Sequence, residues 1–289
     1  MREIPIPVAL AGPGTQPAEA DGASLDILQL PDEMTTFRMP EVPVLEEPEE
    51  CRQGLAVLHR LATTLELAAK QAGLLAEPIE IAGLDTANLS LIDQVLGEGE
   101  VSMIFQGRDC SARIQESVLA GVWRVRHFDA SGLLTQDSIE VAPVPKLCRR
   151  HVFSHAAHRV EMLRETIPAG VLNAPPLLAE INDKIAEYRP GAENHVINLT
   201  LLPQTEEDLV FLIERLGEGR LTILSRGYGN CRITSTGTEH VWWVQYFNSQ
   251  DKNILNTLEI GDVPAVALAA EEDIRDSAVR LNEILEIYQ

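Results

Sequence analysis

The chain has 289 residues, of which 45% are hydrophobic, and it carries a formal net charge of −21 at pH 7. This length suits one large domain or two ordinary ones, and the apolar content is sufficient for a buried core. Nucleic acid phosphates and anionic lipids would repel so negative a chain, so the composition argues against both and favours a basic or apolar partner segment.

The first 50 residues predict an acidic, extended arm. They contain eleven acidic residues against two basic ones, and eight of the 17 prolines. Such a segment buries too little apolar surface to offset the entropy of ordering, so we expect it to be partly disordered when alone. The start lacks signal-peptide features and no apolar run is long enough to span a bilayer, so we expect a cytoplasmic protein without membrane insertion.

The pattern changes after the arm and predicts a mixed helical and strand unit over residues 51–147. Apolar residues at helical spacing predict helices over residues 55–68 and 89–96, with a short strand at residues 79–84 between them. Period-two segments separated by turns then predict mostly antiparallel strands at residues 101–105, 111–117, 121–128 and 135–145.

Residues 191–289 follow the same order and end in a predicted C-terminal helix. Leu96 corresponds to Leu216 at an offset of 120, and Trp123 corresponds to Trp242 at an offset of 119 (242 − 123). We therefore predict an α+β fold of two tandem repeats, each a helix packed on a sheet, joined by a helical connector at residues 148–190. We also expect the repeats to pack on each other, because one helix covers too little of each sheet.

Leu-Gly-Glu-Gly occurs twice, at residues 96–99 and 216–219. We expect the first glycine of each copy to end a helix in the left-handed conformation, and the second to let the chain reverse into a strand. Glu98 and Glu218 are either solvated turn residues or a paired acidic contact for a partner. Tyr228, between two glycines of a predicted hairpin, has the same two interpretations.

The segment after Cys148 carries the most tempting chemistry. On a continuous helix, one face would hold a thiol and three imidazoles that could bind zinc or nickel, namely Cys148, His151, His155 and His158. The alternative, which we favour, is a basic connector whose arginines pair with acidic surfaces. Enzyme signatures such as His-Glu-x-x-His or a Walker loop are absent, so we expect no enzymatic activity and no cofactor. The matching tryptophans, Trp123 and Trp242, are expected to pack in the core against the helix of each repeat.

Several separated stretches resemble the HyaF/HupH hydrogenase expression/formation family. They are GPGTQP at residues 12–17, LIDQVLGEGEVS at 91–102, VWRVR at 122–126, HVINLTLLP at 195–203, GYG at 227–229 and VWWV at 241–244. The resemblance implies a non-enzymatic accessory chaperone in the maturation of uptake nickel–iron hydrogenase. It further implies action on the iron–sulfur small subunit precursor before twin-arginine export, with other maturation proteins as further partners.

The resemblance supplies no catalytic residues, so the site predictions come from charge and loop position. We expect Glu98, Glu218 and Tyr228 at a partner-binding surface, and an arm including Gly12 and Gly14 that orders on the partner. The alternative function is a metal or iron–sulfur cluster carrier in the same pathway, using Cys148 and the nearby histidines.

Overall fold

The computed structural model describes residues 50–71, 76–161, 167–227 and 229–288. The predictions for the arm, for Gly12 and Gly14, and for the side chain of Tyr228 lie outside the described residues. Within them, no helix is both long and apolar enough to cross a membrane.

Among the described residues, the first half of the chain has three helices and five strands. In order they are α1 (Arg52–Lys70), β1 (Ile79–Glu80), α2 (Thr86–Leu96), β2 (Val101–Gln106), β3 (Cys110–Glu116), β4 (Val122–Asp129), β5 (Leu134–Val141) and α3 (Lys146–Arg150). The second half continues with α4 (Ala174–Glu187), β6 (His195–Asn198), α5 (Glu206–Leu216), β7 (Glu218–Ser225), β8 (Asn230–Thr236), β9 (Val241–Phe247), β10 (Asn253–Ile260), the 3-10 helix η2 (Ala265–Ala267) and α6 (Glu271–Glu286).

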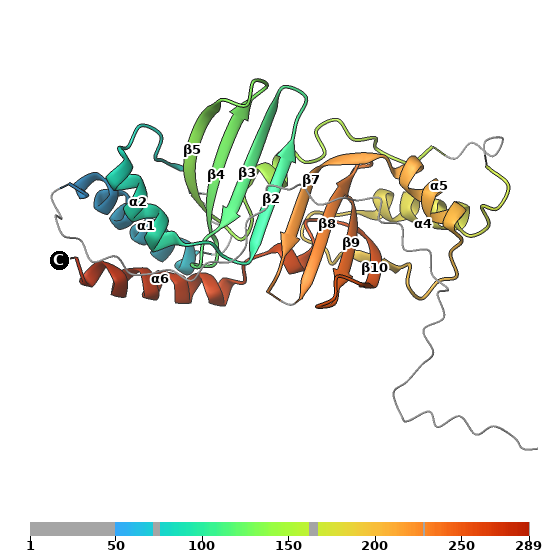
Figure 1. The fold of residues 1–289 in the computed structure, drawn as a ribbon. Coiled ribbons are helices and arrows are strands. Elements are labelled where there is room, and N and C mark those ends of the chain that lie inside the picture. The colour runs from blue at the N-terminus through green and yellow to red at the C-terminus, as the bar shows by residue number, and fades with distance from the viewer. Residues whose placement is uncertain (1–49, 72–75, 162–166, 228, 289) are drawn as a thin grey trace, which may run out of the picture.

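All ten strands form one sheet in the order β1-β5-β4-β3-β2-β7-β8-β9-β10-β6 (Figure 1). Every strand pair is antiparallel, which confirms the predicted α+β class with an antiparallel sheet. The two halves meet where β2 pairs with β7, with Val101 opposite Ser225 and Phe105 opposite Leu221. They therefore join edge to edge and share one continuous sheet.

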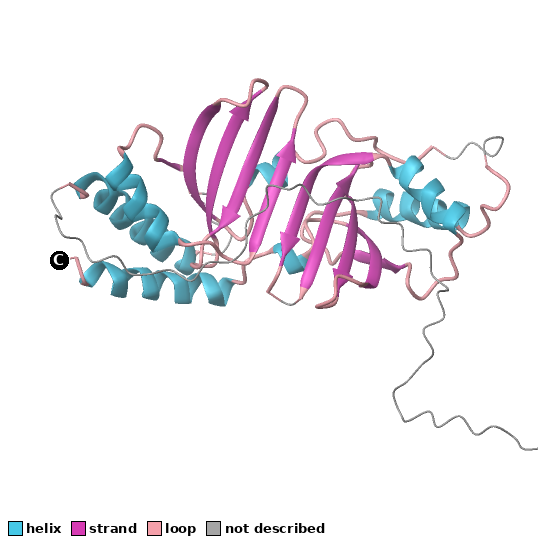
Figure 2. Ribbon diagram, in the orientation of Figure 1, coloured by secondary structure: helices cyan, strands magenta, loops and turns pink. Residues whose placement is uncertain are grey.

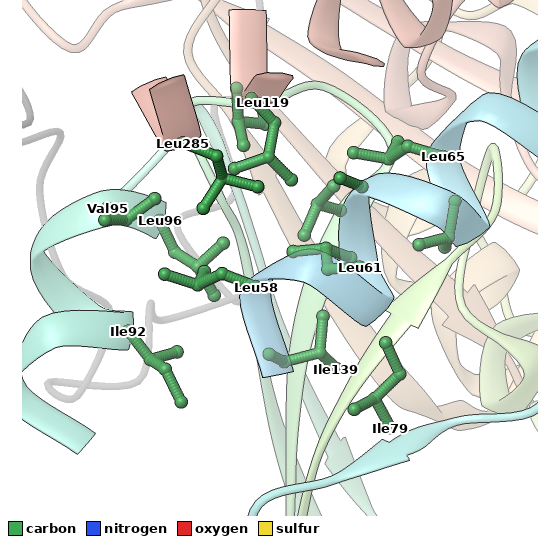
Figure 3. Close-up of a cluster of buried hydrophobic side chains, with 14 of the residues drawn as sticks. Leu58, Leu61, Leu65, Ile79, Ile92, Val95, Leu96, Leu119, Ile139 and Leu285 are labelled. Carbon is green, nitrogen blue, oxygen red and sulfur yellow. The ribbon is translucent and has the colours of Figure 1, made fainter. Parts of the chain in front are cut away.

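The longer helices gather at the two ends of the sheet, with α1, α2 and α6 at one end and α4 and α5 at the other, and leave β2, β3, β7 and β8 between them (Figures 1 and 2). At the first end, α1 buries Leu58, Leu61 and Leu65, which recur at helical spacing along one face. Figure 3 shows these leucines beside Ile139 of β5 and Leu285 of α6, all in one apolar cluster. The C-terminal helix thus belongs to the core of the first half, although its sequence follows the second.

A second cluster lies under the centre of the sheet, on the face opposite to these helices. Trp123 and Trp242 are fully buried in it, and their indole N–H groups donate to the carbonyls of Ala142 (2.8 Å) and Gly261 (3.3 Å). The expectation that the tryptophans are buried is therefore confirmed. The expected contact with the repeat helix is wrong, because this cluster contains residues of α3 and η2 and none of α2 or α5.

The third cluster lies under α4 and α5 at the other end of the sheet. Asp208 of α5 links this helix to the start of α4. Its buried side-chain Oδ1 accepts hydrogen bonds from the backbone N–H groups of Leu172 (2.8 Å), Asn173 (2.8 Å) and Ala174 (2.9 Å). Burial raises the pKa of its carboxyl, but these donors outweigh burial and lower it overall. A buried carboxylate therefore satisfies the N-terminus of one helix from within another.

Candidate partner-binding surfaces

The two Leu-Gly-Glu-Gly corners have the same backbone geometry. Gly97 and Gly217 end α2 and α5 with φ of 54° and 70°, so the positive φ was predicted correctly. Their ψ values of −166° and 168° are extended, however, so the expected left-handed helical conformation is wrong. A Cβ added at Gly99 would overlap the carbonyl oxygen of Ser117, directly after β3, and one at Gly219 would overlap that of Ser235 in β8, which explains the second glycine of each copy.

The structure places the two corners at opposite ends of the β2–β7 ladder. Glu98 precedes the start of β2, whereas Glu218 begins β7, which runs antiparallel to β2. The five paired residues between Val101 and Phe105 separate the corners by at least about 14 Å along the strands. Glu98 and Glu218 therefore cannot touch the same small group of a partner, and their contact with a partner stays a prediction.

The first corner instead lies beside the glycine-flanked hairpin of the second half. The N–H of Arg226 donates to the carbonyl of Glu100 (3.1 Å), and the Glu100 carboxylate occupies the space that a Cβ on Gly227 would need. The negative charges of Glu100 and of Asp273, in the first turn of α6, both help to raise the pKa of buried Glu116. We call Glu98, Glu100 and Asp273 the acidic corner.

Glu116 is the buried acid behind this corner. Burial raises its pKa from 4.5 to about 7. The hydrogen bond that its Oε1 accepts from the N–H of Gly121 (3.3 Å) acts in the opposite direction, and the smaller effects of the Glu100 and Asp273 charges raise the pKa further. The group therefore changes its charge near neutral pH.

The structure does not bring the predicted metal ligands together. The continuous helix that would align these four side chains does not form, because α3 ends at Arg150. The chain then turns, and the ring of Phe153 packs edge-on against Trp242 with the ring centroids 5.1 Å apart. Cys148 is buried with its Sγ 3.3 Å from Met103 Sδ, while the three histidines, His151, His155 and His158, are exposed. Within the described ranges, no three His, Cys, Asp or Glu side chains are grouped as metal ligands.

An arginine-lined surface at the centre of the sheet was not predicted from the sequence. The strand registers place two rows of residues directly opposite one another, and such residues share a face. One row runs Arg126, Arg113, Ile104, Thr222, Thr234, and the next runs Arg124, Gln115, Ser102, Leu224, Arg232, Gln245. We call Arg113, Arg124, Arg126 and Arg232 and the residues between them the arginine face.

The guanidinium groups of the arginine face have different contacts. Arg124 forms a bidentate pair with Asp137 (3.0 and 2.7 Å) and also contacts Asp93. Arg113 lies over the ring of Phe128 at 5.1 Å, and Arg232 lies over the ring of Phe247 at 5.2 Å. These two cation–π pairs hold guanidinium groups in fixed positions on either side of the β2–β7 junction.

The side chain of Arg126 is 43% exposed, and partial burial and then the charge of Arg124 lower its pKa. An arginine guanidinium keeps its positive charge at neutral pH in proteins. Carboxylates oppose part of this charge, since Arg124 pairs with Asp137 and Asp93, and the charges of Asp137 and Glu98 act to raise the pKa of Arg126.

Sequence reasoning missed this face because the arginines are scattered over residues 113–232. Alternation within β3 and β8 puts Arg113 and Arg232 on the same side as their neighbours at i ± 2, but only the β2–β7 register places them on one surface.

Comparison with known proteins gives a consistent result. The family described as "HupH hydrogenase expression protein, C-terminal conserved region" matches residues 38–167 and 171–288. The chain is similar to the hydrogenase expression/formation protein HoxQ of Cupriavidus necator, with 45% identity over 286 residues, covering 99% of this chain and 98% of that protein.

Two further relatives and one solved structure extend the comparison. HupH of Rhodobacter capsulatus is 45% identical over 281 residues, covering 97% of both chains. The hydrogenase-1 operon protein HyaF of Escherichia coli is 34% identical over 282 residues, covering 95% of this chain and 94% of that protein. The solved hydrogenase expression protein HupH from Thiobacillus denitrificans is 28% identical with a TM-score of 0.36, covering 40% of this chain and 94% of that chain.

Proposed function

Because the chain belongs to the HupH hydrogenase expression protein family, we propose that it is a non-enzymatic chaperone in the maturation of uptake nickel–iron hydrogenase. Its client is the iron–sulfur small subunit precursor, which it holds in the cytoplasm before twin-arginine export. Support for the pathway comes from the relatives, whose names are hydrogenase expression/formation protein or hydrogenase operon protein.

The acidic corner is the observation that supports a chaperone of this kind. Glu100 and Asp273 are exposed, and Glu98 is half-buried at the same end of β2. A twin-arginine signal is a basic segment, so a cluster of carboxylates can attract it and speed the encounter. The adjacent Gly227 and Gly229 place a hairpin at the edge of the acidic corner, where loop residues commonly contact partners.

A pull-down with the small subunit precursor tests the acidic corner. Glu98→Lys combined with Glu100→Lys should reduce the captured precursor at least about tenfold, the change that about 1.4 kcal/mol produces. Glu193→Lys combined with Glu214→Lys is the matched control, since both residues are exposed, outside the corner, and the change in charge is equal. Equal capture by both variants would contradict the proposed surface.

Glu218 lies at the opposite end of the ladder and gives a separate prediction. If the precursor contacts both Leu-Gly-Glu-Gly corners, Glu218→Lys alone reduces capture, and the client spans the sheet. If it contacts only the acidic corner, Glu218→Lys behaves as the control does.

We also propose that the two halves are repeats of one ancestral unit. Helix, short strand, helix, four strands and a short helix occur in this order in each half. The acceptors of the two tryptophan indoles, Ala142 and Gly261, differ by 119 residues, as Trp123 and Trp242 do. Shared buried hydrogen bonds at a fixed offset are difficult to reach without a common origin.

A further inference from the structure

We propose that the outer edge of β6 (His195–Asn198) binds an extended, basic segment of another polypeptide by adding it to the sheet as a further strand. This inference does not depend on the hydrogenase client. It rests on unpaired backbone groups of β6, on the corresponding edge of the first half, and on the charged side chains beside β6.

The backbone of β6 leaves hydrogen-bonding groups at the outer edge of the sheet. The N–H of Leu199 donates to the carbonyl of Asn256 in β10 (2.9 Å). Hydrogen-bonded residues alternate along an antiparallel pair, so Ile197 also bonds to β10, and the backbone groups of Val196 and Asn198 point away from it. Among the described residues, none forms a hydrogen bond to these outward N–H and carbonyl groups, so they are available to a further strand.

The corresponding edge of the first half, at β1, is closed by a proline. Ile79 of β1 and Ile197 of β6 occupy equivalent positions, because their partners in β5 and β10 are 119 residues apart (258 − 139). Pro78 therefore corresponds to Val196. Proline has no N–H, so the first edge cannot donate a hydrogen bond at the position where Val196 can. The chain thus protects one edge of its sheet against strand pairing and leaves the other edge open.

The strand register indicates which side chains an added strand would place on each face. Val196 is 52% exposed and lies opposite Glu259, on the face of the sheet that carries Trp242. Ile197 lies on the other face, in the apolar cluster under α4. Side chains alternate along a strand, so a partner residue opposite Val196 shares its face, where an apolar side chain fits, and the residues on either side of it point toward α4.

Carboxylates lie beside the first residue of β6. Glu180 Oε1 of α4 is 2.7 Å from His195 Nε2. Glu187 lies near the same imidazole, because the pKa of its carboxyl is lowered by Lys184 first and also by the charge of His195. Lys184 pairs with Glu187 (2.8 Å).

These carboxylates are more numerous than the cations around them. Residues 180–195 contain four acidic residues, Glu180, Asp183, Glu187 and Glu193, against two permanent cations, Lys184 and Arg189. Asp183 and Glu193 are exposed and form no ion pair with another described residue. Basic side chains of an added strand would therefore find unpaired carboxylates on the α4 side.

A basic segment fits this edge better than a second copy of the chain does. Pairing β6 with itself would bring the same carboxylates of two copies together and would join two chains that each carry a net charge of −21. The occupant that matches both faces alternates apolar residues, which contact Val196, with basic residues, which face α4.

Fluorescence anisotropy of the full chain with labelled peptides of about seven residues tests the proposal. A peptide of alternating valine and lysine should bind, and a peptide of alternating valine and glutamate should bind at least about tenfold more weakly at low salt. The valine and lysine peptide with a methyl group on every backbone nitrogen cannot donate hydrogen bonds, so it should also bind at least about tenfold more weakly.

Variants of the chain separate backbone pairing from side-chain contact. Val196→Pro copies the residue of the closed edge, so the affinity for the valine and lysine peptide should fall at least about tenfold. Val196→Thr keeps the N–H and a β-branched side chain and should bind as the parent does. Glu180→Gln combined with Glu187→Gln should weaken binding. Glu283→Gln combined with Glu286→Gln, at exposed positions of α6, is the matched control and should not.

Each contrary result overturns a stated part of the proposal. Equal affinities for the methylated and unmethylated peptides would overturn strand pairing, even if Val196→Pro fails to fold. Equal affinities for the lysine and glutamate peptides would overturn the basic partner, and so would no binding at about 1 mM protein. Self-association of the parent chain that Val196→Pro abolishes would assign the edge to a second copy instead. None of these results bears on the precursor pull-down, which uses variants of Glu98 and Glu100.

Discussion

Glu116→Gln is expected to stabilise the protein in a pH-dependent way. Burial raises the pKa of Glu116 from 4.5 to about 7, so the fold favours the protonated acid. A raised folded-state pKa means that the resulting cost is absent below the unfolded pKa of 4.5 and is complete above pH 7. A shift of about 2.5 units at 1.36 kcal/mol per unit gives a cost of about 3 kcal/mol when the carboxylate is charged.

Glutamine removes this cost and keeps an acceptor oxygen for the N–H of Gly121. The stability gained by Glu116→Gln should therefore be about 2 kcal/mol larger at pH 8 than at pH 5.5. Both values avoid the isoelectric point near 4.7, where low net charge promotes association.

Urea denaturation of both proteins at the two pH values measures the difference. Glu214→Gln, at an exposed position of α5, is the control and should change stability equally at both values. The reasoning is refuted if Glu116→Gln gives the same change in unfolding free energy at pH 5.5 and pH 8.

Four other substitutions have defined outcomes. Gly99→Ala and Gly219→Ala should each lower the free energy of unfolding by about 1 to 3 kcal/mol, since a Cβ overlaps a strand carbonyl; urea titration measures this. Asp208→Ala should cost about 3 kcal/mol at pH 7, and the difference should become smaller as pH falls through the lowered pKa of Asp208, because protonation already weakens these hydrogen bonds in the parent chain. Cys148→Ala should leave the metal content of untagged protein unchanged by mass spectrometry, and loss of a stoichiometric metal would revive the carrier function.

The strands and helices were largely predictable from periodicity. Alternation around Val122 and Val125 and the leucine spacing of α1 are local signals, and each matches an element of the structure. The glycines of the two corners were also recognisable as helix ends. The extended ψ values of Gly97 and Gly217 were not predictable, because helical spacing shows only where a helix ends.

The sequence patterns did not predict how elements far apart in the chain pack together. The return of α6 to the first half depends on Ile274, Leu281 and Leu285 packing with α1, and an amphipathic helix does not reveal which apolar surface it covers. The arginine face depends on strand register across the β2–β7 junction, which local alternation does not determine. Helical spacing alone similarly misplaced Cys148 beside the histidines, since the chain turns to bury Val152 instead.

Binding of the full chain to purified small subunit, with and without its signal segment, tests the central claim most directly. Titration by calorimetry at 0.1 M salt gives both dissociation constants. The proposed chaperone binds the precursor measurably and binds it more tightly than the form without the signal segment, with an affinity that falls as salt increases. No detectable binding to either form would contradict the proposed function, and equal binding to both would contradict recognition of the signal.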